Sequence, residues 1–387
     1  MRNLASVVCL LALFSASFVS TCYAKWPANQ DALVEKVEQI RRDNAIPGVV
    51  VLLRNGDHQW LQAFGVADLK TKQPMQTDMA FRAGSNTKTM TATVILQLVQ
   101  EGKLKLEDKV SKFFDNVPQG DEVTIADLLD MRSGIANYSE IKSFNQTLDE
   151  QPDKTYSPQQ LIQLGIEQKA MFKPGSKYFY SNTNYVMLGV LIERMTEMPL
   201  EEVFQQRIFT PLKLTRTSMP AKDDNQLPPP FAHGYMFGTN VNSELTEQEQ
   251  KQAVAGKLLP SDMTLANPSW AWAAGAAIST ADDLADYVEV LIGGGLLDES
   301  MQAKRLASIR PANPDDPQSA GYGLGIAQMG PMIGHDGSLP GYQSFMGHDP
   351  KTGLTMIVLT NLQDTPGGEM AANVIAKDLI QMMAPAK

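Results

Sequence analysis

The sequence predicts an α/β protein of the α+β type, in which helices flank a central antiparallel sheet and an all-helical domain is inserted. Three observations lead to this prediction. The chain begins with the pattern of a β-hairpin, helical patterns broken by loops fill its middle, and strand-like segments return near its end. Strands contributed by both ends of a chain are expected to meet in one sheet, so the middle should form the helical part.

The first elements after residue 24 are a helix and two strands. Residues 31–44 carry apolar side chains at helical spacing. An apolar run at 49–53 and a second strand pattern at 59–66 are separated by an Asn-Gly turn signal. This arrangement is typical of an antiparallel hairpin.

The middle of the chain is dominated by helical patterns. An apolar stretch at 90–99 that stops at a glycine predicts a buried helix starting near Ser85. Further helices are expected at 125–131 and 185–195, whereas the polar segment 246–252 is interpreted as an exposed connection.

The pattern changes again towards the end of the chain. A capped helix is expected at 281–292 and a closing helix at 367–383. Between them, strand patterns occupy 322–327, 343–347 and 354–359.

These elements define the expected domains. Residues 25–84 and 273–387 should form the sheet-containing domain and residues 85–272 the mainly helical domain, with the active site between the two.

Residues 1–24 have the pattern of a secretory signal peptide. A short cationic start with Arg2 precedes an apolar run at 4–19 and a Cys-Tyr-Ala cleavage signal. We therefore expect a periplasmic or secreted protein without stable membrane insertion after signal removal. Both cysteines, Cys9 and Cys22, lie in this segment, which excludes thiol chemistry in the mature chain.

The charge balance argues against nucleic-acid binding. The chain has 33 basic and 43 acidic residues, and its formal net charge of −10 repels phosphate backbones and anionic lipid. Its four histidines show no spacing of a known ligand set, so neither a metal nor another cofactor is expected.

An S-x-x-K motif supplies a candidate nucleophile and base. Lys88 follows Ser85 at helical spacing, which returns the ammonium to the face that carries the hydroxyl. Burial would depress the lysine pKa, so that a neutral amine could take the serine proton. A second match, Ser139 with Lys142, lies in a polar loop-like stretch. We assign the nucleophile to Ser85 because it follows a glycine and begins an apolar helix.

Two further motifs supply polar side chains. In an extended backbone Tyr180 and Asn182 would point to the same side, as a proton relay and an amide ligand. His335 could supply a proton or a positive hydrogen bond, and Gly337 allows a substrate backbone to approach the strand edge. Each motif alone is more often structural, so their combination decides the interpretation.

With these three motifs in this order, the chain resembles the superfamily of serine β-lactamases, D-alanyl-D-alanine carboxypeptidases and esterases, the penicillin-recognising serine hydrolases. It is similar to the branch in which His-x-Gly replaces Lys-Thr-Gly. The resemblance runs over nearly all of the mature chain and implies a β-lactamase/transpeptidase-like fold.

The resemblance also implies roles for the polar residues. Ser85 would attack the carbonyl, Lys88 would be the base during acylation and Tyr180 would shuttle protons. Asn182 would bind the substrate amide, and His335 would stand in for the usual lysine.

The resemblance adds two more residues, Ser338 and Trp270. The backbone N–H groups of Ser85 and Ser338 would form an oxyanion hole. Trp270 resembles an aromatic wall of the substrate cleft, although a packed core aromatic is an equally good interpretation.

Two positions depart from the family pattern. Carboxypeptidases of this branch carry an arginine where Ala327 stands and a hydroxyl residue where Asp336 stands. Both changes remove affinity for a substrate carboxylate, and we expect Asp336 to repel one at close range.

The sequence thus predicts an exported serine hydrolase that forms an acyl-enzyme at Ser85 and acts on D-amino-acid peptides, as DD-peptidases and D-Ala-D-Ala carboxypeptidases do. The expected partners are small-molecule or peptidoglycan-like peptide substrates, with β-lactams as covalent inhibitors or substrates. An esterase or a β-lactamase of the same fold is the alternative. A non-catalytic penicillin-binding or sensor protein is the alternative of a different class.

Overall fold

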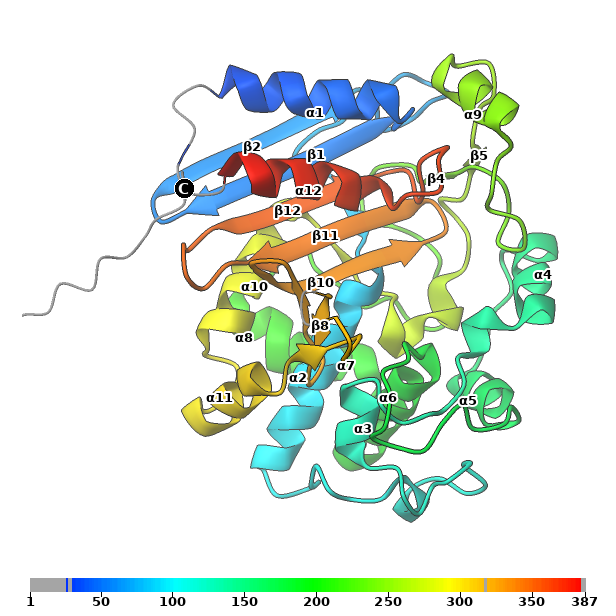
Figure 1. Cartoon of the computed structure of the whole chain (residues 1–387), viewed down its shortest axis with the longest axis vertical. Helices are drawn as coiled ribbons and strands as arrows, with labels where there is room; N and C mark the ends of the chain where they lie inside the picture. The colour runs from blue at the N-terminus through cyan, green and yellow to red at the C-terminus, as the bar shows by residue number, and fades with distance from the viewer. Residues whose placement is uncertain (1–25, 27–29, 317–318, 384–387) are drawn as a thin grey trace, which may run out of the picture.

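The computed structural model describes residues 26, 30–316 and 319–383. Its centre is an eight-stranded antiparallel sheet with the strand order β2-β1-β12-β11-β10-β9-β8-β7 (Figure 1). The strands of this sheet are β1 (Gly48–Asn55), β2 (His58–Gly65), β7 (Arg310–Pro311), β8 (Gly321–Tyr322), β9 (Ala327–Met329), β10 (Met332–Leu339), β11 (Tyr342–His348) and β12 (Thr355–Thr360). Two short pairs complete the strands: β3 (Phe81–Arg82) with β6 (Ile278–Ser279), and β4 (Tyr235–Met236) with β5 (Ser261–Asp262).

Helices cover both faces of the sheet and form a separate helical part, coloured cyan to green in Figure 1. The α-helices are α1 (Asp31–Asp43), α2 (Thr87–Gln100), α3 (Ile125–Leu129), α4 (Lys142–Glu150), α5 (Pro158–Ile166), α6 (Asn182–Thr196), α7 (Leu200–Phe204), α8 (Thr210–Leu212), α9 (Glu247–Val254), α10 (Ala281–Gly293), α11 (Glu299–Ala307) and α12 (Ala371–Met383). Short helical turns are η1 (Gly84–Asn86), η2 (Val110–Lys112), η3 (Tyr138–Glu140), η4 (Gln205–Phe209), η5 (Pro268–Trp270) and η6 (Trp272–Ala274).

The two faces of the sheet belong to two different apolar cores. Val49 and Val51 of β1 pack with α1 and α12, whereas Val50 and Leu52 face the core that includes α10. Figure 1 shows α1 and α12 lying along one face of the sheet. Because both faces are covered, β1 is a continuous apolar run and not an alternating one.

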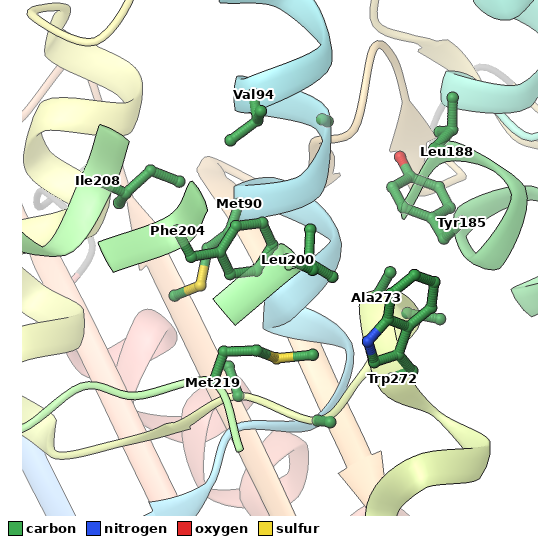
Figure 2. Close-up of a cluster of buried hydrophobic side chains, with 14 of the residues drawn as sticks. Met90, Val94, Tyr185, Leu188, Leu200, Phe204, Ile208, Met219, Trp272 and Ala273 are labelled. Carbon is green, nitrogen blue, oxygen red and sulfur yellow. The ribbon is translucent and has the colours of Figure 1, made fainter. Parts of the chain in front are cut away.

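The helix α2 forms the centre of the helical part. Every residue from Thr87 to Leu96 is buried, so the helix packs on all sides instead of exposing a polar face. Figure 2 shows Met90 of α2 beside Phe204 of α7, with Tyr185 of α6 and Trp272 of η6 in the same cluster. This packing holds the N-terminal end of α2 against α6 and η6.

The expected fold class is confirmed: a large antiparallel sheet with flanking helices and a helical middle. The expected hairpin and the helices α1, α2, α10 and α12 are all present, as are strands β11 and β12. The exact domain boundaries near residues 84 and 273 stay predictions.

Two expected assignments were wrong, one of a strand and one of a loop. The segment 322–327 is not one strand, because β8 ends at Tyr322 and a turn through Gly325, with φ +73°, leads into β9. The segment 246–252 is not a plain connection, because Thr246 and Glu249 form a capping box that starts α9.

Two further differences affect the candidate site. The strand β10 was not predicted, because glycines interrupt its apolar pattern. His335 therefore lies within a strand, whereas the sequence placed it before one. Asn182 is the first residue of the helix α6 and not part of an extended segment, as the sequence suggested. Ser181, which lies between Tyr180 and Asn182, does have an extended backbone.

The expected signal peptide at 1–24, with both cysteines, lies outside the described residues. Within the described ranges, no helix has both the length and the apolar character needed to cross a membrane.

Two leucines test how much the sheet core contributes to stability. Leu359 is fully buried in β12, whereas Leu259 is 69% exposed. We expect Leu359→Ala to lower the free energy of unfolding by about 2–5 kcal/mol, through lost apolar contact and a residual cavity. The matched Leu259→Ala should change it by about 0.5 kcal/mol or less. Urea unfolding followed by circular dichroism measures both, and equal losses would contradict the described core.

Candidate active site

Ser85 lies in the turn η1, between the short strand β3 and the helix α2. It is the one residue of segment 79–96 that is not buried. The turn is tied to the sheet because Asn86 Nδ2 donates to Ser344 Oγ of β11 at 2.7 Å. Thr87 Oγ1 donates to the Gly84 carbonyl at 2.8 Å and accepts from the Ala277 N–H at 3.0 Å. The hydroxyl of Ser85 is therefore presented from a rigid turn.

Lys88 is fully buried one helical turn after Ser85. Its Nζ lies 3.1 Å from Ser85 Oγ, 2.7 Å from Asn182 Oδ1 and 2.7 Å from the Ala274 carbonyl oxygen. Burial lowers the pKa of Lys88 well below its usual value, and the Asp336 carboxylate offsets part of this effect. A neutral amine donates two hydrogens to the two pure acceptors, and its lone pair then faces Ser85.

Tyr180 lies over the same lysine, with Lys88 Nζ 4.7 Å from the centre of the phenol ring. Burial raises the pKa of Tyr180 well above its usual value, although a hydrogen bond with Ser85 lowers it in part. The phenol is therefore neutral and can donate a proton. Of the two side chains next to Ser85, these pKa directions favour Lys88 as the base.

His335 lies on β10 and is 2% exposed. Its Nδ1 lies 2.6 Å from the carbonyl oxygen of Asp336, which can only accept, so Nδ1 carries a hydrogen. The other nitrogen, Nε2, lies 3.0 Å from the Tyr322 hydroxyl. Burial raises the pKa of Tyr322 well above its usual value, so its hydroxyl keeps a proton that it can donate. The ring centres of His335 and Tyr180 lie 6.2 Å apart, so the imidazole is next to the phenol ring.

The Asp336 carboxylate lies between His335 and α12, with Oδ1 3.6 Å from His335 Nδ1. Its Oδ2 accepts from Asn373 Nδ2 at 2.7 Å, and its side chain lines a cavity of about 500 Å³ beside Phe345 and Ile380. The expected repulsion of a substrate carboxylate by Asp336 stays a prediction; within the site, the Asp336 charge acts on Lys88.

Gly337 and Gly84 allow β10 to approach the nucleophile. A Cβ atom on Gly337 would lie 2.1 Å from the Ala83 carbonyl oxygen and 2.8 Å from the Ser85 backbone nitrogen. A Cβ on Gly84, where φ is +56°, would lie 2.6 Å from the backbone nitrogen of Ser338. The backbone nitrogens proposed for the oxyanion hole thus belong to two segments in direct contact.

Trp270 lies in η5 and is half-buried. Its ring packs edge-on against Phe144 with 6.2 Å between ring centres, and its carbonyl accepts from the Tyr138 hydroxyl. The side chain is therefore packed on one side and partly accessible on the other, so both interpretations of this residue stay open.

The structure also brings Ser139 to the site, which the sequence analysis had set aside. Asn182 Nδ2 donates to Ser139 Oγ at 2.9 Å. Lys142, the other half of that S-x-x-K match, is exposed on α4. The second motif is therefore not a nucleophile–base pair, but its serine contacts a predicted site residue. No spacing in the sequence signals this contact.

The arrangement suits acyl transfer without a metal ligand set. Within the described ranges, no group of three or more His, Cys, Asp or Glu side chains could hold a metal ion. A hydroxyl, a buried amine, a neutral phenol and two backbone N–H groups lie together, and these are the parts that activate a serine and stabilise an oxyanion.

Comparisons with known proteins agree with this arrangement. The family model described as Beta-lactamase matches residues 33–379. Penicillin-binding protein 4* of Bacillus subtilis is 25% identical over 357 residues, which cover 89% of this chain and 74% of that protein. The D-aminopeptidase of Brucella anthropi is 27% identical over 319 residues, which cover 82% of this chain but 56% of that protein. A D-stereospecific amidohydrolase structure from Streptomyces sp. has a TM-score of 0.77 and 28% identity, covering 92% of this chain and 98% of the other.

The contact between β10 and η1 can be tested with one methyl group. Gly337→Ala should push β10 away from the turn that carries Ser85 and lower the acylation rate by about 100-fold or more, as loss of an oxyanion donor does. Gly293→Ala is the matched control, because nothing lies within 4 Å of a Cβ at that position. Burst kinetics with a chromogenic substrate measure the rate, and an unimpaired Gly337→Ala enzyme would contradict the close approach.

Proposed function

Since the chain belongs to the β-lactamase family, we propose that it is a serine hydrolase that forms an acyl-enzyme at Ser85. Its proposed substrates are amides of D-amino acids with a free amino group, including short D-peptides. Export to the periplasm or the medium, expected from residues 1–24, is part of this proposal.

The observation that carries the proposal is the bonding of Lys88. A buried amine with two acceptors and a serine hydroxyl within 3.1 Å is set to receive the serine proton. Ser85 Oγ then attacks the amide carbon, and the oxyanion is held by the backbone N–H groups of Ser85 and Ser338. The carbon–nitrogen bond breaks as the leaving amine takes a proton that Tyr180 relays from Lys88. Water then attacks the ester at Ser85 and releases the free amino acid.

The substrate class rests on relatives and on charge. The D-aminopeptidase and the D-stereospecific amidohydrolase support a D-amino-acid acyl group by their names. Release of a carboxy-terminal residue would need a cation for its carboxylate, and the neutral Ala327 occupies the position that the family resemblance assigns to arginine. Two cations near Tyr322, Arg132 and Arg310, are paired with Asp130, and a third, Arg305, is fully buried.

A reaction with β-lactams is the second candidate. It is favoured by the similarity to penicillin-binding protein 4* and by the match to the β-lactamase family. In this case Ser85 opens the lactam ring, and the stability of the resulting ester decides between an inhibited enzyme and a β-lactamase.

A substrate panel tests the proposed specificity. We expect D-phenylalanine p-nitroanilide to be hydrolysed faster than its L-enantiomer by about 100-fold or more. The reason is that the site would bind the acyl group in one orientation relative to Ser85, which only one enantiomer fits. N-acetylated D-phenylalanine p-nitroanilide and a peptide ending in D-Ala-D-Ala should react poorly. Release of nitroaniline, or of D-alanine in a coupled assay, gives each rate. Preference for the acetylated D-Ala-D-Ala peptide would instead establish a carboxypeptidase.

Variants of the two central residues test the mechanism. Ser85→Ala should abolish turnover and the covalent adduct with a fluorescent penicillin, measured by intact mass. Lys88→Arg keeps the positive charge but cannot act as a base, so it should lose about 100-fold or more in kcat, as Lys88→Met should. Because burial lowers the Lys88 pKa, wild-type activity should rise with pH well below the usual lysine range and then level off. An active Lys88→Arg enzyme would show that Lys88 acts only as a cation.

A further inference from the structure

A closed set of three hydrogen bonds lies behind Asn182 and involves Asn137 and Ser139. The backbone N–H of Asn182 donates to Asn137 Oδ1 at 3.1 Å. Ser139 Oγ donates to the same Oδ1 at 3.0 Å, and Asn182 Nδ2 donates to Ser139 Oγ at 2.9 Å. The remaining atom of the amide, Asn182 Oδ1, lies 2.7 Å from Lys88 Nζ.

Each bond in this set has only one possible direction. A backbone N–H can only donate, so the atom of Asn137 that receives it is the oxygen. The hydroxyl hydrogen of Ser139 also points to that oxygen, which leaves Ser139 Oγ as an acceptor. The acceptor turns the nitrogen of the Asn182 amide towards Ser139 and its oxygen towards Lys88. An amide orientation that is usually ambiguous is therefore fixed by its neighbours.

We propose that Ser139 is a positioning residue, which holds the Asn182 amide with its oxygen towards Lys88 and so keeps the lysine lone pair free for Ser85. This inference rests on the proposed acyl-enzyme function. If the amide turned around, Asn182 Nδ2 would donate into the lone pair of the neutral amine. The base would then be occupied, and the ammonium form of Lys88 would lose one of its acceptors.

The effect of Ser139 on Lys88 passes through Asn182. The titratable and charged groups around Lys88 on the packed elements are Tyr180, Tyr185 of α6, His335 and Asp336 of β10, and Arg305 of α11, which binds α2 at Thr89 and Thr93. Among the described residues, none of these groups shares a hydrogen bond with Ser139. A change confined to Ser139 should therefore leave their charges in place.

The test compares pH profiles of kcat/KM for D-phenylalanine p-nitroanilide in the wild type and four variants. Ser139→Ala removes the acceptor, Ser139→Cys keeps its volume but weakens it, and Ser139→Thr retains the hydroxyl. Ser143→Ala is the matched control, an exposed serine on α4. Thermal melts of all variants report folding.

We expect Ser139→Ala and Ser139→Cys to lower the plateau of kcat by about 10-fold with little change in KM, since a base is impaired and not a binding contact. A hydrogen bond that stabilises the ammonium raises the Lys88 pKa, so its loss lowers that pKa. The acid limb of the profile should therefore move to lower pH, by about one unit for a bond to a charged group. Ser139→Thr and Ser143→Ala should match the wild type.

Two outcomes would overturn the inference. If Ser139→Ala and Ser139→Cys melt like the wild type and keep its plateau and acid limb, Ser139 has no positioning role and the proposed function still stands. If the wild type neither turns over the substrate nor forms a penicillin adduct, the proposed function fails and this inference fails with it. Should Ser139→Ala not fold, the comparison of Ser139→Cys with Ser139→Thr decides the matter alone.

Discussion

The candidate site depends on one constraint: an amine is buried completely at the start of α2. Burying an ammonium ion without partners costs several kcal/mol, so the fold must either surround it with acceptors or let it lose its proton. Here it does both. Asn182 from α6 and the Ala274 carbonyl from η6 supply the acceptors, and burial favours the neutral form of Lys88. The packing of α2 against α6 and η6 is thus also what favours the neutral amine of Lys88.

The sequence was sufficient for residues whose chemistry is encoded in short spacings. Ser85 and Lys88 are three apart on a helix, and Tyr180 and Asn182 are two apart in a turn that leads into a helix. The structure brings the other three side chains together around the buried amine of Lys88. The hairpin and the terminal strands were equally accessible, because buried strands are apolar runs bounded by turn residues.

What the sequence could not provide depends on contacts between distant segments. The strand β10 carries Gly334 and Gly337 because the neighbouring backbone leaves no room for a Cβ atom, and this need is invisible in a propensity pattern. The contact of Asp336 with Asn373 joins β10 to α12, and no spacing in the sequence relates these two residues. The contact of Ser139 with Asn182 likewise arises from the packing of η3 against α6, since no local spacing relates residues 139 and 182.

The pairing of β1 with β12 has a consequence for how the molecule is made. Val50 lies opposite Leu359, so the central strands join the two ends of the chain and give the fold a high contact order. The turn that carries Ser85 rests on β11 through Ser344, and β11 is held by β12. A chain still emerging from the ribosome, or one truncated before β12, therefore lacks the strands that support the turn with Ser85. The turn with Ser85 is therefore fully supported only after β11 and β12 have been synthesised, when the segment that contains α12 remains to be made.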